Sequence, residues 1–371
     1  MRMLSTWTTG LALVGLSMLY QPFAGAAPAS TPGERVAAQA AVGDSVRSVG
    51  LDSLSDLSVK YPGGVTGYPD LTYQTLLGYR PMTLDLFLPP PSYDKKGPRP
   101  WIMYIHGGGW AFGGKRRSAA YLDWPKVLAS IAAEGFVVTS VSYRFSNEAP
   151  SPAAIQDVKA AIRWLRVNAA KYHLDPDRGM TWGQSAGGQL AALAAVTCGV
   201  KALDPPARVD PNAPNVEVSA SAPKGADAVS DCVQGAVAWF GEYDFAASYK
   251  EHKASANAGR PDLMSLFLGC QGPCTAEQLR RPSPIAYVDA KNPPILLMHG
   301  TDDTTVDPAQ SKAFEAALQK AGVRTKLVML PGVGHSWIGK TPEATHHASK
   351  VALQQSMEFF ESIIGDDAKQ K

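Results

Sequence analysis

The stretch that most constrains this chain is the string Gly-Gln-Ser-Ala-Gly at 183–187, with Ser185 at its centre. Residues 178–182 before it are typical of the end of a buried strand, and the alanine-rich segment 188–195 after it predicts a helix. Between a strand and a helix, Gly-x-Ser-x-Gly predicts a sharp turn with a strained serine and no room for flanking side chains. The helix start then directs amide donors toward the serine hydroxyl. A chain with 34 glycines can carry this pattern by chance, so other residues have to support it.

Apolar runs alternate with helical patterns along the rest of the chain. Alternating residues predict half-buried antiparallel strands at 71–74 and 82–88. Buried strands are predicted at 101–105, 136–141, 178–182, 233–240, 295–298 and 325–330. Helices are predicted at 124–134, 152–172, 188–195, 309–321 and 344–364. This alternation predicts an α/β fold with a central, mostly parallel sheet and helices on both faces.

The N-terminus has the features of a targeting segment. Residues 1–26 combine Arg2, a short apolar run and a small-x-small cleavage site, so we expect a signal peptide, with an uncleaved anchor as the alternative. The apolar run is shorter than the roughly 20 residues that span a bilayer, which predicts a secreted or periplasmic protein without a stable membrane span. The formal net charge of +2 gives no indication of a nucleic-acid partner.

The remainder divides into a leader and one domain. Residues 27–60 are rich in small residues and predict a flexible leader, with regular structure starting near Leu71. Residues 61–371 predict a single α/β domain. Within it, the proline-rich stretch 200–231 lacks a hydrophobic period and predicts a surface excursion.

Export permits disulfide bonds, and the chain has four cysteines. Three pairings are possible. We favour Cys198 with Cys232, which closes the proline-rich loop, and Cys270 with Cys274, which pins a short turn. No cysteine pair has histidines at ligand spacing, so we expect no metal site, and no organic cofactor is implied.

A serine nucleophile needs donors for the oxyanion that forms on its substrate. His106 follows the predicted strand 101–105 and opens a His-Gly-Gly-Gly-Trp string, which rarely arises by chance. Glycines leave backbone amides uncovered, so we assign the amides of Gly108 and Gly109, with that of Ala186, to an oxyanion hole. We expect His106 to brace this loop rather than to act as the base.

The serine also needs a base and a carboxylate that orients the base. Asp303 and Asp302 both follow the predicted strand 295–298, and His335 follows the last strand in a glycine-rich loop. In open parallel sheets such groups gather at the carboxyl ends of strands. We therefore predict a triad of Ser185, His335 and Asp303, with Asp302 as the alternative acid.

From about residue 70 to 363 the chain resembles secreted α/β-hydrolase esterases with a His-Gly-Gly-Gly-Trp loop. These include bacterial feruloyl and acetyl-xylan esterases and hormone-sensitive-lipase-like carboxylesterases. The resemblance is carried by residues 106–110, 141–144, 157–165, 182–188, 239–241, 283–284 and 299–306. In this family the acid is the fifth residue of a His-Gly-x-x-Asp string, which here starts at His299 and selects Asp303. We interpret His299 as structural and Asp157 as a structural ion-pair residue.

The resemblance implies ester hydrolysis through an acyl-enzyme. Glu242-Tyr243 departs from the Pro-Thr that such sequences often show after Trp-Phe-Gly, in a region that borders the acyl pocket of relatives. Trp110 and Trp337 are further candidates for a substrate pocket, and they fit a core position equally well. The expected substrate is a small-molecule or polysaccharide-linked ester outside the cell. A prolyl-peptidase-type serine peptidase and a non-catalytic binding module are the alternatives.

Overall fold

The computed structural model describes residues 57–205, 229–255 and 262–370. They belong to a compact unit that runs from Asp52 to Lys371. The predicted signal peptide at 1–26 lies outside the described residues, as do most of the predicted leader at 27–60 and residues 206–228 of the excursion.

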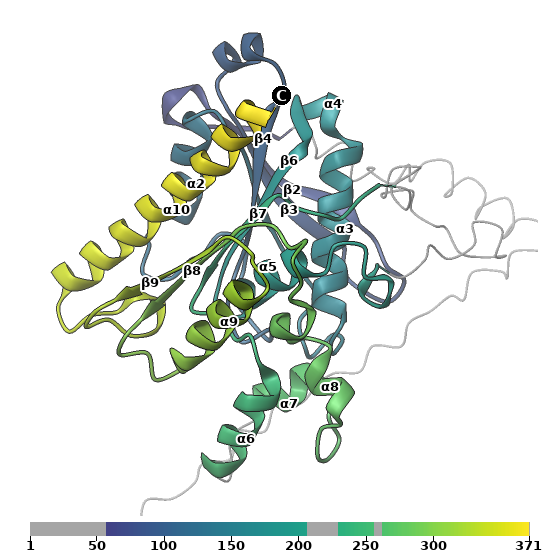
Figure 1. Cartoon of the computed structure of the whole chain (residues 1–371). Coiled ribbons are helices and arrows are strands. Elements are labelled where there is room, and N and C mark those ends of the chain that lie inside the picture. The colour runs from purple at the N-terminus through teal and green to yellow at the C-terminus, as the bar shows by residue number, and fades with distance from the viewer. Residues whose placement is uncertain (1–56, 206–228, 256–261, 371) are drawn as a thin grey trace, which may run out of the picture. The chain divides into compact units, whose positions relative to one another are not determined.

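A single nine-stranded sheet forms the centre of this unit, in the order β1-β2-β3-β5-β4-β6-β7-β8-β9 (Figure 1). β1, β2, β3 and β5 pair antiparallel in that order, and the six strands β4 to β9 are mutually parallel. The strands are β1 (Val59–Lys60), β2 (Thr66–Gln74), β3 (Met82–Leu88), β4 (Arg99–Ile105), β5 (Val137–Val141), β6 (Leu174–Gln184), β7 (Gly235–Trp239), β8 (Ile295–Gly300) and β9 (Thr325–Leu330). The predicted mostly parallel sheet is confirmed.

Helices cover both faces of the sheet, as predicted. Figure 1 shows α3 and α5 on one side and α2 and α10 on the other. The helices are α2 (Trp124–Ala133), α3 (Ala153–Val167), α4 (Ala169–Tyr172), α5 (Ala186–Val196), α6 (Phe245–Ser255), α7 (Leu263–Leu268), α8 (Ala276–Arg280), α9 (Ala309–Lys320) and α10 (Pro342–Gln370). Within the described ranges, no helix is long and apolar enough to cross a membrane.

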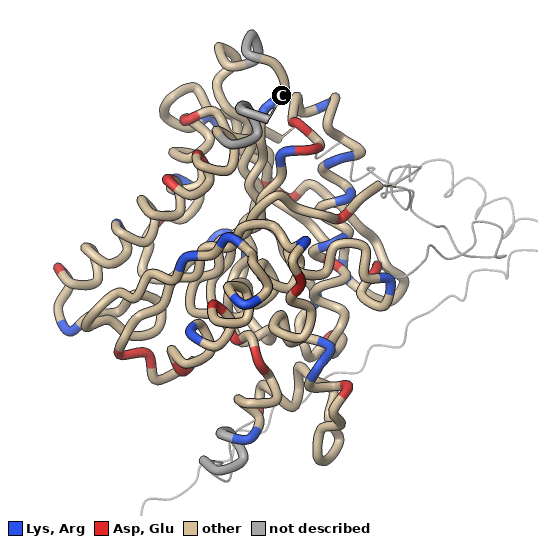
Figure 2. The backbone as a smooth tube through the Cα atoms, viewed as in Figure 1, with Lys and Arg blue, Asp and Glu red and all other residues tan. Residues whose placement is uncertain are grey.

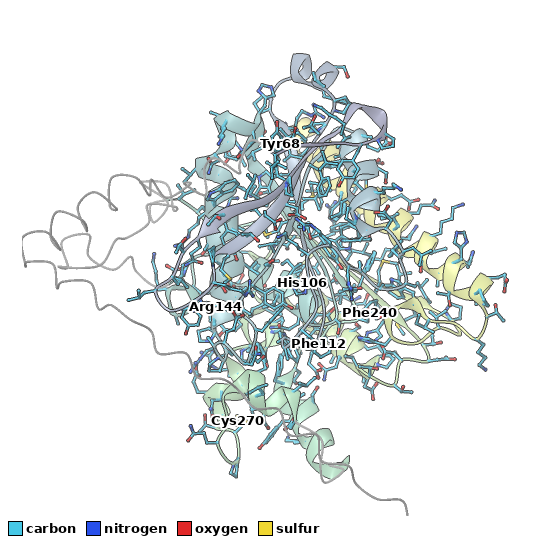
Figure 3. All side chains as sticks on the ribbon, turned by 180° about the vertical axis from the view of Figure 1, so that it is seen from behind. Tyr68, His106, Phe112, Arg144, Phe240 and Cys270 are labelled. Carbon is cyan, nitrogen blue, oxygen red and sulfur yellow. A yellow bond between two sulfur atoms is a disulfide. The ribbon has the colours of Figure 1, made fainter. Side chains whose placement is uncertain are left out.

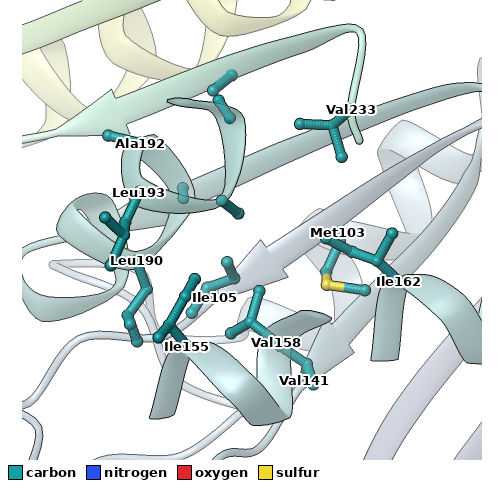
Figure 4. Packing of buried hydrophobic residues seen from close by; sticks show 14 of the residues in the cluster. Met103, Ile105, Val141, Ile155, Val158, Ile162, Leu190, Ala192, Leu193 and Val233 are labelled. Atoms are coloured by element: carbon teal, nitrogen blue, oxygen red, sulfur yellow. The ribbon is translucent and has the colours of Figure 1, made fainter. Parts of the chain in front are cut away.

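The two faces of the sheet carry separate apolar cores. On one face, side chains of α3 and α5 such as Val158 and Leu190 pack on the strands (Figure 4), and Phe314 of α9 belongs to the same cluster. On the other face, Trp124 of α2 and Phe360 of α10 pack against the opposite side of the same strands. Strands that are covered on both faces bury every residue, which explains why β5 and β7 are continuous apolar or small-residue runs.

Several elements differ from the sequence prediction. The sheet starts earlier than the expected position, Leu71, because β1 pairs with the first residues of β2. The helix predicted at 152–172 is interrupted at Asn168, whose side-chain amide donates to the carbonyl of Trp164 (2.9 Å). Helices α6, α7 and α8, between β7 and β8, were not predicted, since α7 and α8 are short and α6 has little amphipathic character.

Buried ion pairs join α3 to neighbouring segments of the chain. Asp157 pairs with Arg144 (2.8 Å), which confirms its predicted structural role. Asp231, at the end of the predicted surface excursion, is buried, and it contacts both Lys159 (3.1 Å) and Arg163 (3.0 Å). This end of the excursion is therefore part of the core and not a surface segment. Elsewhere basic and acidic residues are interspersed along the chain (Figure 2).

Both favoured disulfides are present, Cys198–Cys232 and Cys270–Cys274. No free cysteine occurs among the described residues. Disulfides are compatible with an oxidising compartment. The first bond joins the end of the α5 region to the residue that follows the buried Asp231, so it closes the excursion against the core.

We expect the two disulfides to contribute unequally to stability. The chain-entropy model assigns about 4 kcal/mol to the bond that spans 34 residues and about 2 kcal/mol to the bond that spans four. Urea unfolding of the double variant Cys198→Ser/Cys232→Ser should show the larger loss in the free energy of unfolding. The matched control is Cys270→Ser/Cys274→Ser, and a larger loss in that control would contradict the prediction.

Candidate active site

Ser185 lies in a sharp turn between β6 and α5. Its backbone has φ 52° and ψ −123°, a strained conformation for a residue with a side chain. The Ser185 amide donates to the carbonyl of Trp239 (2.9 Å) at the end of β7. A Cβ atom on Gly183 would collide with the backbone of Gly187, and one on Gly187 would collide with the carbonyl of Ile105. The glycines thus permit the close packing that holds the strained serine.

His335 lies over this turn, in the short 3-10 turn His335–Trp337 that follows β9. Its Nε2 is 2.9 Å from the Oγ of Ser185, and its Nδ1 is 2.8 Å from an oxygen of Asp303. An ionised carboxylate only accepts hydrogen bonds, so Nδ1 carries the proton and Nε2 is free to accept the serine hydroxyl. The imidazole also packs edge-on against the ring of Phe240 (4.7 Å between centroids).

Asp303 follows β8, and its side chain is completely buried. One oxygen accepts the amides of Thr305 (2.8 Å) and Val306 (3.0 Å), and the other contacts His335. Burial acts to raise the pKa of Asp303, but hydrogen bonds from His299 and His335 outweigh it and hold that pKa well below its usual value. The structure therefore brings together Ser185, His335 and Asp303.

Asp302, the alternative acid, is exposed. It accepts a hydrogen bond from the hydroxyl of Thr301 (2.8 Å). The side chain of Asp303 rather than Asp302 is thus the one in contact with the imidazole.

The glycine-rich loop after β4 passes directly beside the serine. A Cβ on Gly107 would lie 3.2 Å from the Cβ of Ser185. Gly108 and Gly109 have φ values of 124° and 56°, which glycine adopts without strain. In the part of the chain that the structure describes, the amides of Gly108, Gly109 and Ala186 make no hydrogen bond to another residue. They are available to a ligand oxygen.

Trp110 anchors this loop. Its ring stacks on Phe267 of α7 (4.3 Å between centroids), and its Nε1 donates to Gln189 of α5 (2.9 Å). Trp110 is buried, so it clamps the loop between two helices. By contrast, Phe112 is 58 % exposed, and its ring lies within 4.0 Å of the Cβ position of Gly109 (Figure 3). Phe112 was not singled out from the sequence.

The other predicted pocket residues are also buried. Trp337 has no exposed surface and packs on Trp239, and Tyr243 has none and stacks on Phe314. Glu242 is buried and accepts a hydrogen bond from a neighbouring serine hydroxyl. Trp110, Trp337, Glu242 and Tyr243 are thus packed in the interior, which for Trp110 and Trp337 is the core position that the sequence also allowed, and their place in a substrate pocket stays a prediction.

His106 braces the start of the loop, as predicted. It is buried, its ring stacks on Tyr143 (4.5 Å between centroids), and its Nδ1 is 2.7 Å from the carbonyl of Gly107. Burial lowers its pKa to about 4. Among the described residues, no cluster of His, Cys, Asp or Glu side chains could hold a metal ion.

Comparison of the sequence with known protein families identifies a match. The BD-FAE family profile matches residues 84–318. The chain belongs to the BD-FAE family. This family is of the hormone-sensitive-lipase and feruloyl-esterase type, so the resemblance seen in the sequence is confirmed.

Named relatives of this BD-FAE protein are esterases. Esterase LipQ of Mycobacterium tuberculosis (strain ATCC 25618 / H37Rv) is 32% identical over 239 residues, which cover 64% of this chain and 50% of LipQ. The chain spans about half the length of the curated relatives that it matches.

Solved structures agree with the α/β-hydrolase fold. A truncated carbohydrate esterase from gut microbiota is 28% identical, with a TM-score of 0.61, over 82% of this chain and 98% of the other. Esterase Est2 of Thermogutta terrifontis, at 23% identity and a TM-score of 0.59 over 81% of this chain and 93% of the other, supports the fold alone.

The positions of the two aspartates predict different effects of their removal. Asp303→Asn should lower ester turnover by several orders of magnitude, because the amide cannot hold the imidazole in the required tautomer. Asp302→Asn is the matched control, and since its carboxylate is exposed we expect a change of less than about threefold. Initial rates on p-nitrophenyl acetate test this ranking, which the reverse order would overturn.

The buried His106 predicts a loss of stability in acid. Its folded pKa of about 4 lies below the unfolded value of 6.5, so the unfolded chain binds the additional proton between these values. The contribution of His106 to the free energy of unfolding is complete above pH 6.5. It falls by about 3 kcal/mol as the pH is lowered toward 4. Urea unfolding across this range should show a shallower decline in His106→Asn than in the wild type. Equal slopes would contradict the prediction.

Proposed function

We propose that this protein is a carboxylic-ester hydrolase that works through an acyl-enzyme on Ser185. The observation that carries the proposal is the continuous line of hydrogen-bonding contacts from the Oγ of Ser185 through His335 to the buried Asp303. The esterase names of the relatives support the same reaction class.

In the first half of the reaction, the Oγ of Ser185 attacks the ester carbonyl while its proton passes to Nε2 of His335. Asp303 stabilises the imidazolium that forms and keeps the ring in the correct orientation. The tetrahedral intermediate collapses when the imidazolium protonates the leaving alkoxide. The alcohol departs and the acyl group remains on the serine.

In the second half, Nε2 of His335 takes a proton from water, and the hydroxide attacks the acyl-enzyme. Collapse of this second intermediate returns the proton to Ser185 and releases the carboxylic acid. In both intermediates the free amides of Gly108, Gly109 and Ala186 would donate to the oxyanion. The loss of one such donor typically costs about 10²–10³ in turnover.

For the substrate, we propose an extracellular ester that is either small or linked to a plant polysaccharide. One structural relative is a carbohydrate esterase from gut microbiota, which supports this class. The exposed Phe112 beside Gly109 offers an apolar surface to a substrate group. Export by the segment 1–26 and a single hydrolase domain at 61–371 belong to the same proposal, and the two disulfides support it.

The test is covalent labelling followed by a hydrolysis panel. A fluorophosphonate probe should label the wild type at Ser185 at neutral pH and leave Ser185→Ala unlabelled. Ser185→Ala should also lose at least about 10³-fold in ester turnover, because the nucleophile is gone. The panel compares acetyl, butyryl, octanoyl and feruloyl esters, acetylated xylan and a prolyl peptide.

Each result discriminates between the candidate functions. Absence of labelling in a folded wild type would favour the non-catalytic binding module. Faster cleavage of the prolyl peptide than of every ester would favour the peptidase. The control is Ser336→Ala, which changes a neighbouring serine in the same turn as His335 and should keep its label.

A further inference from the structure

A second histidine contacts the acid of the candidate triad. His299 lies at the end of β8, is completely buried, and was interpreted from the sequence only as structural. Its Nε2 is 3.2 Å from the Oδ2 of Asp303, the oxygen that His335 contacts from the other side. The i,i+4 spacing of the two residues in the His-Gly-x-x-Asp string brings about this contact across the tight turn.

The surroundings of His299 fix which nitrogen carries the proton. Nε2 faces the carbonyl of Val306 (3.0 Å) and the carboxylate of Asp303, and both groups only accept hydrogen bonds. Nε2 therefore carries a hydrogen. Nδ1 lies 2.7 Å from the hydroxyl of Ser311 on α9, which can donate to it. Ser311 thus orients the ring so that its single Nε2–H lies against both the Val306 carbonyl and the Asp303 carboxylate.

With this contact, two groups lie against each oxygen of Asp303. The amides of Thr305 and Val306 occupy Oδ1, and His335 and His299 occupy Oδ2. Rotation of the carboxylate would break at least one of these four contacts. The N–H of His299 beside Oδ2 also stabilises part of the negative charge on that oxygen. Less of this charge is then available to stabilise the protonated imidazole of His335.

We propose that His299 is a positioning residue that locks the Asp303 carboxylate and, through the shared oxygen, limits how strongly Asp303 stabilises protonated His335. This inference rests on the proposed ester hydrolysis. The ionisable side chains that face this carboxylate in the described chain are His299 and His335, and Tyr243 lies beyond Ser311.

The direction in which the acid limb of the kcat/KM profile moves distinguishes this role from simple packing. If His299 shares the charge of Asp303, its removal leaves more charge for His335 and stabilises the protonated, inactive form of the base. The acid limb of kcat/KM then moves to higher pH. If His299 only fills space, its removal loosens Asp303, weakens its contact with His335, and leaves the acid limb in place or moves it lower.

The experiment compares His299→Leu with the conservative variant His299→Gln, whose side-chain amide can still donate near the position of Nε2. In His299→Leu we expect the acid limb to rise by about half to one pH unit. We also expect kcat/KM on the plateau to fall between about 10-fold and 100-fold. His299→Gln should restore the wild-type limb, and His347→Leu, at an exposed histidine on α10, should change neither quantity.

A second measurement does not need turnover. The downfield proton resonance of the His335 Nδ1–H should shift in His299→Leu and return in His299→Gln. An unmoved resonance together with an acid limb that stays or falls would overturn the proposal. A wild type without ester turnover or probe labelling would instead overturn the proposed function, and the resonance would still decide the role of His299. If His299→Leu does not fold, Ser311→Ala should show the same shifts, smaller in size.

Discussion

Close backbone packing at the turn between β6 and α5 is the constraint on which the rest of the site depends. Ser185 adopts a positive φ, and this conformation persists only because neighbouring backbone surrounds it. Gly187 lies against the end of β4, and the amide of Ser185 is bonded to the end of β7. Since those strands flank β6 in the sheet, the sheet itself holds Ser185 in place.

The other site residues take their positions from the same sheet edge. Parallel strands end on one side, so loops after β4, β8 and β9 deliver the glycine loop, Asp303 and His335 to one place. The α6–α8 insert contributes in a different way, because Phe267 of α7 stacks on Trp110 and fixes the glycine loop from outside the sheet. A site on rigid strand ends needs only short loops to reach its working distances.

Much of this arrangement could be predicted from the sequence, because it depends on local patterns. The elbow, the order of strands and helices and both favoured disulfides follow from motif, periodicity and spacing, whereas the resemblance to the esterase family is what selects Asp303 over Asp302. The burial of Trp337 and Tyr243 could not be predicted, since an aromatic residue beside a motif fits a pocket and a core equally well. The contact of His299 with Asp303 had a signal in its i,i+4 spacing, but the tight turn that brings the side chains together is a tertiary feature.

The turn that carries His335 also carries Trp337, which is packed in the core between Trp239 and Phe240. The imidazole of His335 and a large core side chain are thus two residues apart in one short turn. His335 cannot shift without repacking of the buried Trp337. Repacking of this part of the core would in turn displace His335. A substitution within these three residues therefore alters the packing of the core and the position of the imidazole together.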